Sequence, residues 1–239
     1  YFVISESTKT HQGKNKKINF NINNFKKFKN KIKFVVADYQ NNDVPFNHSG
    51  GESLIEQHQR NSLVQGLDGA REEDLIILSD SDEIPDLSKI NQIKSTTKFT
   101  AFSQKMYMYK LNIENKNESN WIGSKIVKKK DLTSFQSLRD LKFKNYPFWR
   151  IDKFQSQIIY GGWHFSFLNS PEEIANKIKS FSHGEFNQED FIDTNNIAKR
   201  ILNKEDIFER GYKLKKVDID ESFPEYILKN TSLLKDWIV

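Results

Sequence analysis

Three carboxylates come directly after an apolar run in the segment LIILSDSDEIP, residues 75–85. Asp80 and Asp82 are separated by one residue, and Glu83 follows them at once. Carboxylates this close repel one another, and burying them costs free energy unless a cation is present. Carboxylate oxygens suit hard divalent cations, which proteins often share with substrate phosphates. The spacing therefore indicates a site for Mn²⁺ or Mg²⁺, with Asp80 and Asp82 as metal ligands.

Two other interpretations of this segment stay open. The carboxylates could belong to an exposed turn before a helix that begins at Pro85, because acidic residues also favour a helix N-terminus. A phosphatase that transfers phosphate to aspartate also carries two aspartates one residue apart. That pattern is expected at the first strand and before Gly-Thr, whereas here it follows the third strand-like segment and precedes Glu-Ile-Pro. We therefore prefer the metal interpretation to the phosphatase.

Strand-like and helix-like patterns alternate up to this segment. Residues 1–7, 31–39 and 74–80 read as strands. Residues 21–29 and 51–67 place apolar side chains at helical spacing. This order predicts an α/β fold with a mixed, mostly parallel central sheet flanked by helices. The unbroken apolar run at 75–78, within the strand-like segment 74–80, is typical of a strand that is buried on both faces of a parallel sheet.

Carboxylates at the ends of the predicted strands are candidates for one shared site. Ligands of parallel sheets bind beyond the carboxyl ends of the strands. Glu6, Asp38 and Asp80 all fall at such ends. We therefore expect these three side chains to line the same site.

Longer strands dominate the chain after Lys98. Residues 98–112 and 121–132 read as antiparallel strands, and residues 155–169 read as a strand with a Gly-Gly break. Helices are predicted at residues 85–93, 133–141, 170–181, 187–203 and 223–230. No repeat or long linker separates the halves, and 239 residues are enough to bury one core. We expect a single domain over residues 1–239.

The composition excludes several classes of protein. Hydrophobic residues make up 36% of the chain, charged residues 29% and aromatic residues 13%, which suits neither a disordered nor a membrane-embedded protein. No apolar run approaches the roughly 20 residues that span a bilayer, and no signal peptide is visible. The absence of cysteine excludes disulfides and thiolate catalysis. We expect a cytoplasmic or membrane-peripheral protein without a transmembrane segment.

The net charge of +5 comes mostly from lysines. They are dense at residues 13–17, 26–33, 125–130 and 212–217. A solvated lysine-rich surface would explain them, as would attraction to phosphorylated ligands or to an anionic membrane. The aromatic residues do not alternate with the lysines as they would in a base-stacking platform, and no nucleic-acid module is recognisable. We therefore expect no nucleic-acid partner.

The chain resembles glycosyltransferase family 17 in seven segments that follow one another in the family's order. They are SESTKTHQGK (5–14), EQHQRNSLVQGL (56–67), LIILSDSDEIP (75–85), WIGS (121–124), YGGWHFSFL (160–168), SFSHGEF (180–186) and DIFERG (206–211). The resemblance implies a GT-A-like nucleotide-sugar-binding fold and an inverting transfer from a UDP-sugar, UDP-GlcNAc, to a glycan or glycolipid. Residues 1–97 would form the nucleotide-sugar-binding half of the domain and residues 98–239 the acceptor-side half. A non-catalytic nucleotide-sugar- or glycan-binding protein of the same fold is the alternative.

The resemblance also implies roles for residues on the donor side. Asp80 and Asp82 match the family's D-x-D motif, in which Asp82 would be the direct metal ligand and Asp80 would reach toward the ribose or the metal. Lys14 could pair with phosphate, although an ordinary surface lysine is the alternative, and Glu6 could accept a hydrogen bond from uracil or ribose. The predicted donor-binding residues are Glu6, Thr10, His11, Lys14, Asp38, Arg60 and Asp80.

Arg60 and His164 each have a structural and a functional interpretation. Arg60 lies one helical turn after Glu56, so an ion pair within the helix would explain it, whereas the resemblance implies an approach to the diphosphate. His164 could be a buried structural histidine, whereas the resemblance makes it a ligand or a proton acceptor. Trp163 offers a flat face to a sugar, and Trp163 and Trp121 are the predicted acceptor-binding residues.

An inverting transfer requires a group that takes the proton of the acceptor hydroxyl. Glu185 is the first candidate for this base, Glu83 is its main rival, and His164 is the third. His183, two residues before Glu185, would instead complete the metal shell.

Overall fold

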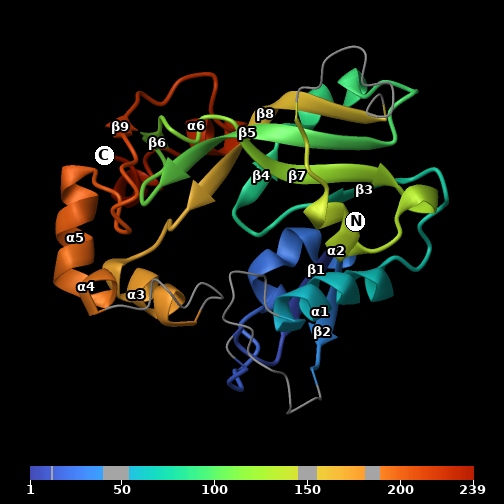
Figure 1. Cartoon of the computed structure of the whole chain (residues 1–239), viewed down its shortest axis with the longest axis horizontal. Helices are drawn as coiled ribbons and strands as arrows, with labels where there is room; N and C mark the ends of the chain where they lie inside the picture. The colour runs from blue at the N-terminus through green and yellow to red at the C-terminus, as the bar shows by residue number, and fades with distance from the viewer. Residues whose placement is uncertain (12, 40–53, 145–154, 181–188) are drawn as a thin grey trace.

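The computed structural model describes residues 1–11, 13–39, 54–144, 155–180 and 189–239 (Figure 1). Its larger sheet has seven strands. Five follow the order β3 (Leu75–Leu78), β7 (Trp121–Lys128), β5 (Phe99–Met108), β6 (Ile113–Asn115) and β9 (Leu214–Lys216). The other two are β8 (Ser156–Ser166), which pairs with β5, and β4 (Glu83–Pro85), which pairs with β8.

The prediction of a mostly parallel central sheet is wrong. In the large sheet β5 and β8 run parallel, whereas β3–β7, β5–β7, β5–β6, β4–β8 and β6–β9 are antiparallel pairs. The order of strands and helices along residues 1–80 suggested parallel pairing. The error arose because β3 pairs with β7, a strand from the second half of the chain. Whether two such strands run parallel or antiparallel depends on a contact between residues that are far apart in the sequence.

The apolar run of β3 is explained by packing on both of its faces, although its neighbour β7 runs antiparallel to it. Ile76 and Leu78 belong to a cluster with Phe135 and Leu138 of α2 (Phe135–Asp140). Ile77 packs on the opposite cluster, which is formed by side chains from β5, β7 and β8. A strand covered on both sides reads as continuously hydrophobic whichever way its neighbours run.

A second, two-stranded sheet is parallel and consists of β1 (Phe2–Ser7) and β2 (Ile32–Ala37). The 3₁₀ helix η1 (Ile22–Lys31) leads into β2. Helix α1 (Leu54–Ser62) and the 3₁₀ turn η2 (Leu63–Gly66) pack on this sheet. Figure 1 shows this unit, in blue and cyan, beside the end of the large sheet that carries β3.

The remaining helices cover the far end of the large sheet. Alternate β5 side chains divide between two clusters: Met106 and Met108 pack with α3 (Pro171–Ser180) and α5 (Thr194–Asn203), whereas Tyr107 packs with Ile227 of α6 (Glu225–Lys229). Helix α4 (Glu189–Ile192) precedes α5, and Figure 1 shows α3, α4 and α5 together. The predicted helices at 133–141, 170–181 and 223–230 are confirmed, and that at 187–203 divides at Asp193, which caps α5.

The segment after the acidic residues differs from the prediction. Glu83–Pro85 is a strand, and the helical residues that follow form the 3₁₀ turn η3 (Leu87–Gln92), capped by Asp86. Pro85 therefore ends a strand instead of opening a helix. Two further 3₁₀ turns are η4 (Lys129–Asp131) and η7 (Lys235–Trp237). In the described ranges no helix combines the length and the apolarity needed to cross a bilayer.

Candidate active site

Residues 79–83, called the acidic turn below, link β3 to β4. Strand β3 pairs with β7 and β4 pairs with β8, and β7 and β8 lie on opposite sides of β5. The acidic turn therefore crosses from one side of β5 to the other. At its start, Ser79 Oγ donates a hydrogen bond to Ser124 Oγ at 2.7 Å. At its end, the Phe165 N–H donates to the Asp82 carbonyl at 2.9 Å. The turn is therefore attached to both neighbours of β5.

Gly162 allows β4 to approach β8 closely. Its φ is +108°, a backbone conformation that is strained for any residue other than glycine. A Cβ at this position would also lie 2.5 Å from the Ile84 carbonyl oxygen. The predicted Gly-Gly break is therefore the place where the strand that follows the acidic turn is held against β8. The register sets Glu83 opposite His164.

Glu83 points into the protein and organises the acidic turn. Its side chain is only 2% exposed. Oε1 accepts a hydrogen bond from Trp121 Nε1 at 2.9 Å, and Oε2 accepts one from the Asp80 N–H at 3.2 Å. Burial, and then the charge of Asp80, raise the pKa of Glu83 above its ordinary value, although Arg139 and Trp121 oppose that shift.

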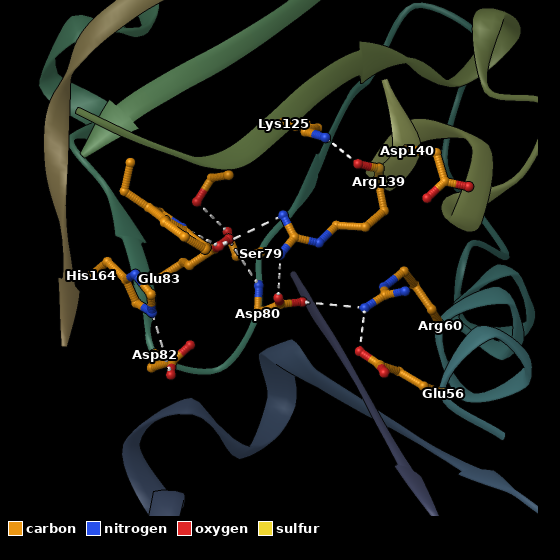
Figure 2. Close-up of polar contacts among 12 residues, drawn as sticks. Glu56, Arg60, Ser79, Asp80, Asp82, Glu83, Lys125, Arg139, Asp140 and His164 are labelled. Atoms are coloured by element: carbon orange, nitrogen blue, oxygen red, sulfur yellow. Dashed lines mark hydrogen bonds and ion pairs between the residues drawn. The ribbon is translucent and has the colours of Figure 1, made fainter. Parts of the chain in front are cut away.

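Asp80 faces two arginines from different helices (Figure 2). Arg139 Nη2 lies 2.9 Å from Asp80 Oδ2, and Arg60 Nη2 lies 3.9 Å from Asp80 Oδ1. Arg139 also places Nη1 3.8 Å from Glu83 Oε1. The Asp80 side chain nevertheless remains 37% exposed, so a ligand can still reach it.

Each arginine is itself held in position. Arg60 is buried on α1, where Glu56 accepts from it at 2.9 Å and Gln136 of α2 at 2.5 Å. The ion pair predicted within the helix is therefore present, and Arg60 contacts Asp80 as well. Lys125 donates to the backbone carbonyls of residues 139 and 141 at the end of α2. Burial and the charge of Arg139 lower the pKa of Lys125 to about 8.

Asp82 faces the opposite side of the turn (Figure 2). His164 Nε2 lies 3.5 Å and Lys177 Nζ 3.7 Å from Asp82 Oδ2. Burial by itself raises the pKa of Asp82, but the interaction with His164 and the charge of Lys177 outweigh burial and hold the pKa below its ordinary value. Asp82 is therefore ionised at neutral pH.

His164 is a buried histidine that packs on Trp121, with the ring centroids 4.7 Å apart. Its Nδ1 is buried and has no hydrogen-bond partner in the part of the chain that the structure describes. Since Nε2 faces the Asp82 carboxylate, its N–H can donate to that carboxylate. His164 thus orients Asp82.

The predicted donor-binding residues of the N-terminal segment divide into two groups. Burial raises the pKa of Glu6, but hydrogen bonds from Lys16 and from the N–H groups of residues 19 and 20 hold that pKa below its ordinary value. Thr10 and Lys14 form a local turn, and Asp38 accepts from Thr8 at 2.9 Å.

His11 lies nearer to the acidic turn. Its Nδ1 is 3.9 Å from Glu56, the acid that also binds Arg60. Burial lowers the pKa of His11, although the negative charges of Glu56 and Asp80 both oppose that shift. Of the predicted donor-side residues, the described contacts bring together Asp80, Arg60 and His11.

The two predicted acceptor-binding tryptophans use their indole N–H groups within the protein. Trp163 Nε1 donates to the Ser222 carbonyl at 2.9 Å, and its ring packs beside Tyr107 and Phe165. Trp121 donates to Glu83. His183 and Glu185 lie outside the described residues, so their predicted roles as metal ligand and base stay predictions.

Sequence reasoning missed Arg139 and Lys177. Arg139 occupies the last turn of a predicted helix, where a basic residue is expected simply to complement the helix dipole. Lys177 lies between Ile174 and Ile178 on a helix whose spacing pointed only to a core face. Neither position carried a signal of contact with the acidic turn.

The carboxylates of the acidic turn fit a divalent cation that takes further ligands from elsewhere. Among the described residues, no group of three or more His, Asp and Glu side chains is arranged to hold a metal ion. Asp80 and Asp82 supply oxygen ligands and are both partly exposed. Mg²⁺ commonly binds one or two carboxylates and completes its shell with water and phosphate oxygens, so either of these carboxylates, which face opposite sides of the turn, suits a cation that arrives with a phosphorylated ligand.

Comparison with protein families gives a match to the family described as glycosyltransferase family 17, over residues 1–213. Comparisons with curated proteins and with solved structures gave no match.

Proposed function

The chain belongs to glycosyltransferase family 17, and from this premise we propose that it transfers a sugar, GlcNAc from UDP-GlcNAc, to a glycan or glycolipid with inversion. The cations gathered around the two aspartates of the acidic turn support donor binding most directly. Arg60 and Arg139 face Asp80, while Lys177 faces Asp82. A diphosphate carries the charge that such groups bind.

Arg139 and Arg60 would hold the donor diphosphate by exchanging Asp80 for phosphate oxygens. Both guanidinium groups are anchored by other contacts, Arg60 by Glu56 and Gln136 and Arg139 beside Glu83. The exchange therefore needs only a small movement. Released from Arg139, Asp80 would be available to the ribose or to the metal.

Asp82 would hold Mn²⁺ or Mg²⁺ together with the diphosphate, and Asp80 would assist. Bound there, the cation would act as a Lewis acid that stabilises the negative charge on the departing UDP. His164 keeps the Asp82 carboxylate oriented toward the site. Lys177 would give up its contact of 3.7 Å, which its flexible side chain permits.

In the transfer, the acceptor hydroxyl oxygen forms a bond to the anomeric carbon while the bond from that carbon to the diphosphate oxygen breaks. The electron pair of the broken bond leaves with UDP. The hydroxyl proton passes to a base, and attack from the face opposite the leaving group inverts the carbon. Glu185 remains our candidate for the base.

Glu83 suits a positioning role better than the role of base. A base must reach the acceptor hydroxyl, but Glu83 is almost fully buried and both of its oxygens already accept hydrogen bonds. One of these bonds comes from the backbone of Asp80. Glu83 therefore sets the shape of the turn that presents the aspartates.

The proposal is tested by incubating the protein with a panel of UDP-sugars and either Mn²⁺, Mg²⁺ or a chelator, and by measuring UDP release. We expect release from UDP-GlcNAc that depends on metal and that falls on the order of 100-fold in Asp82→Asn, since a metal contributes several kcal/mol to such a step. Asp74→Asn, at the opposite end of β3, is the matched control and should retain activity.

Three results would count against parts of the proposal. Full activity of Asp82→Asn would exclude Asp82 as the metal ligand, and full transfer by Glu185→Gln would exclude Glu185 as the base. Tight binding of UDP-sugars without UDP release under any metal condition would favour a non-catalytic binding protein of the same fold.

A further inference from the structure

The two faces of the β1–β2 sheet differ in what covers them. Val35 and Ala37 are buried, and Ser5, which pairs with Val35, donates through Oγ to the Gln59 carbonyl of α1. Alternate residues point to opposite faces of a sheet. Phe2, Ile32, Phe34 and Val36 therefore lie on the face away from α1, which is called the outer face below.

Only a thin aromatic layer covers the outer face in the described structure. Phe20 stacks on Phe34 at 4.8 Å and on Phe25 at 5.5 Å. Beyond it, Phe25 and Phe28 of η1 are each 43% exposed and Phe2 is 57% exposed. Helix η1 contains no buried residue, so its phenylalanines are not accounted for by a core.

Lysines surround these aromatic side chains. Residues 26–31 contain four of these lysines and no aspartate or glutamate. Lys26, Lys27, Lys29 and Lys31 on η1 are exposed, and none has an acidic partner among the described residues. By contrast, the basic segment at 128–130 is paired, because its three lysines contact Glu72 and Glu73.

We propose that the outer face and η1 bind the surface of an anionic lipid membrane. Aromatic side chains beside lysines are the combination found on elements that lie in a membrane interface, where the rings enter the headgroup region and the lysines meet anionic headgroups. A second copy of this chain is a poor partner, because a two-fold contact would bring the lysines of η1 against themselves. A soluble polyanion would not require exposed phenylalanines.

This surface leaves the acidic turn accessible. Arg60, which contacts Asp80, belongs to α1 on the other face of the β1–β2 sheet. The inference rests on the outer face alone and does not depend on the proposed donor or acceptor.

The test is co-sedimentation of the full chain with vesicles of phosphatidylcholine, alone or with roughly one third phosphatidylglycerol, at low and high salt. We expect binding only to the anionic vesicles, weakened by salt. The triple variant Lys26→Gln, Lys27→Gln, Lys29→Gln should bind on the order of 100-fold more weakly, since each lysine near such a surface contributes about fivefold. The double variant Phe25→Ser, Phe28→Ser should bind about tenfold more weakly.

The triple variant Lys128→Gln, Lys129→Gln, Lys130→Gln removes the same charge from the paired basic segment and is the control. Circular dichroism and thermal unfolding establish that each variant is folded. No binding to anionic vesicles, or equal losses in both lysine variants, would overturn the proposal. Undiminished vesicle binding by the phenylalanine variant would also overturn it and would indicate a soluble polyanion or an acidic protein as the partner.

Discussion

The two aspartates of the acidic turn are one residue apart, yet they occupy different environments. Arg139 lies 2.9 Å from the Asp80 carboxylate, and Arg60 lies 3.9 Å from it. Arg139 also contacts the buried Glu83. Among the described residues, Asp82 has longer contacts of 3.5 and 3.7 Å to the side chains of His164 and Lys177. The Asp80 end is thus held more tightly than the Asp82 end, so a ligand that replaces partners must displace a closer contact at Asp80 than at Asp82.

The two ends also differ in the physical cause that sets their acidity. At Glu83, burial and the charge of Asp80 raise the pKa. At Asp82, burial acts in the same direction, but His164 and Lys177 outweigh it and the pKa falls. The balance between burial and different partners, Arg139 and Trp121 at Glu83 but His164 and Lys177 at Asp82, therefore shifts the pKa of two adjacent acids in opposite directions.

The largest effect is expected from Gly162→Ala, which disturbs the attachment of β4 to β8 and hence the Asp82 end. The new Cβ would combine an unfavourable φ of +108° with a 2.5 Å contact to the backbone oxygen of Ile84, and we expect a loss of about 3 kcal/mol or more in the free energy of unfolding. Urea denaturation measures this. Gly69→Ala has a similar φ and no neighbour within 4 Å, so it should cost only about 1 kcal/mol; equal losses would show that strain alone acts at Gly162.

The second prediction concerns Arg139→Ala, which removes the anchor of Asp80. Glu83 would lose a compensating charge while still buried, so we expect a loss of about 2 kcal/mol in the free energy of unfolding. Arg139→Lys should recover only part of it, because one ammonium group cannot contact both acids as the guanidinium does. Arg71→Ala removes an ion pair with Asp74 in which the arginine side chain is exposed, and it should change stability little. A loss in Arg139→Ala no larger than that would contradict the anchoring role.

The third prediction uses the pH dependence of stability. A carboxyl whose pKa is raised by folding loses stability as pH rises from its unfolded pKa through its folded pKa, whereas one whose pKa is lowered loses stability as pH falls through its folded pKa. Glu83→Gln should therefore remove a decline in stability above the ordinary glutamate pKa. Asp82→Asn should remove a decline on the acid side, below the ordinary aspartate pKa. Denaturation curves from acid to neutral pH measure both, and the same slope change in the two variants would refute the contrast.

The smallest effect on stability is expected from Lys177→Met. Its side chain is nearly half exposed and its Nζ lies 3.7 Å from Asp82 Oδ2, and such surface pairs contribute less than about 0.5 kcal/mol. If the Asp82 end exchanges partners on binding, the variant should nevertheless change the concentration of Mn²⁺ or of UDP-sugar required for half-maximal UDP release. Thermal unfolding and that titration together decide, and a large loss of stability with an unchanged titration would assign Lys177 to the structure.

Elements defined by local pattern were predicted well. The helical spacing at residues 133–141 and 170–181 corresponds to α2 and α3, and the strand-like apolar stretch in residues 1–7 corresponds to β1. These predictions succeed because a helix or strand is chosen by side chains a few positions apart. The direction of the large sheet was predicted wrongly because β3 pairs with β7, about fifty residues later in the chain.

The site shows the same division. The spacing of the aspartates and the apolar run before them marked the acidic turn, and the position of Glu56 indicated the ion pair of Arg60. The main partner of Asp80, in contrast, is Arg139, which lies 59 positions away. Nothing near Arg139 in the chain distinguishes it from a helix-terminal basic residue.

The sequence by itself determined the residue types, most of the helices and strands, and the family, which is carried by segments in a given order. Only the tertiary structure decided which acid meets which cation, which way the strands of the large sheet run, and that lysines 128–130 are paired while those of η1 have no acidic partner among the described residues. The physical reason is distance along the chain. Local geometry follows from neighbouring side chains, whereas pKa shifts, ion pairs and strand direction follow from contacts that exist only after distant segments have packed together.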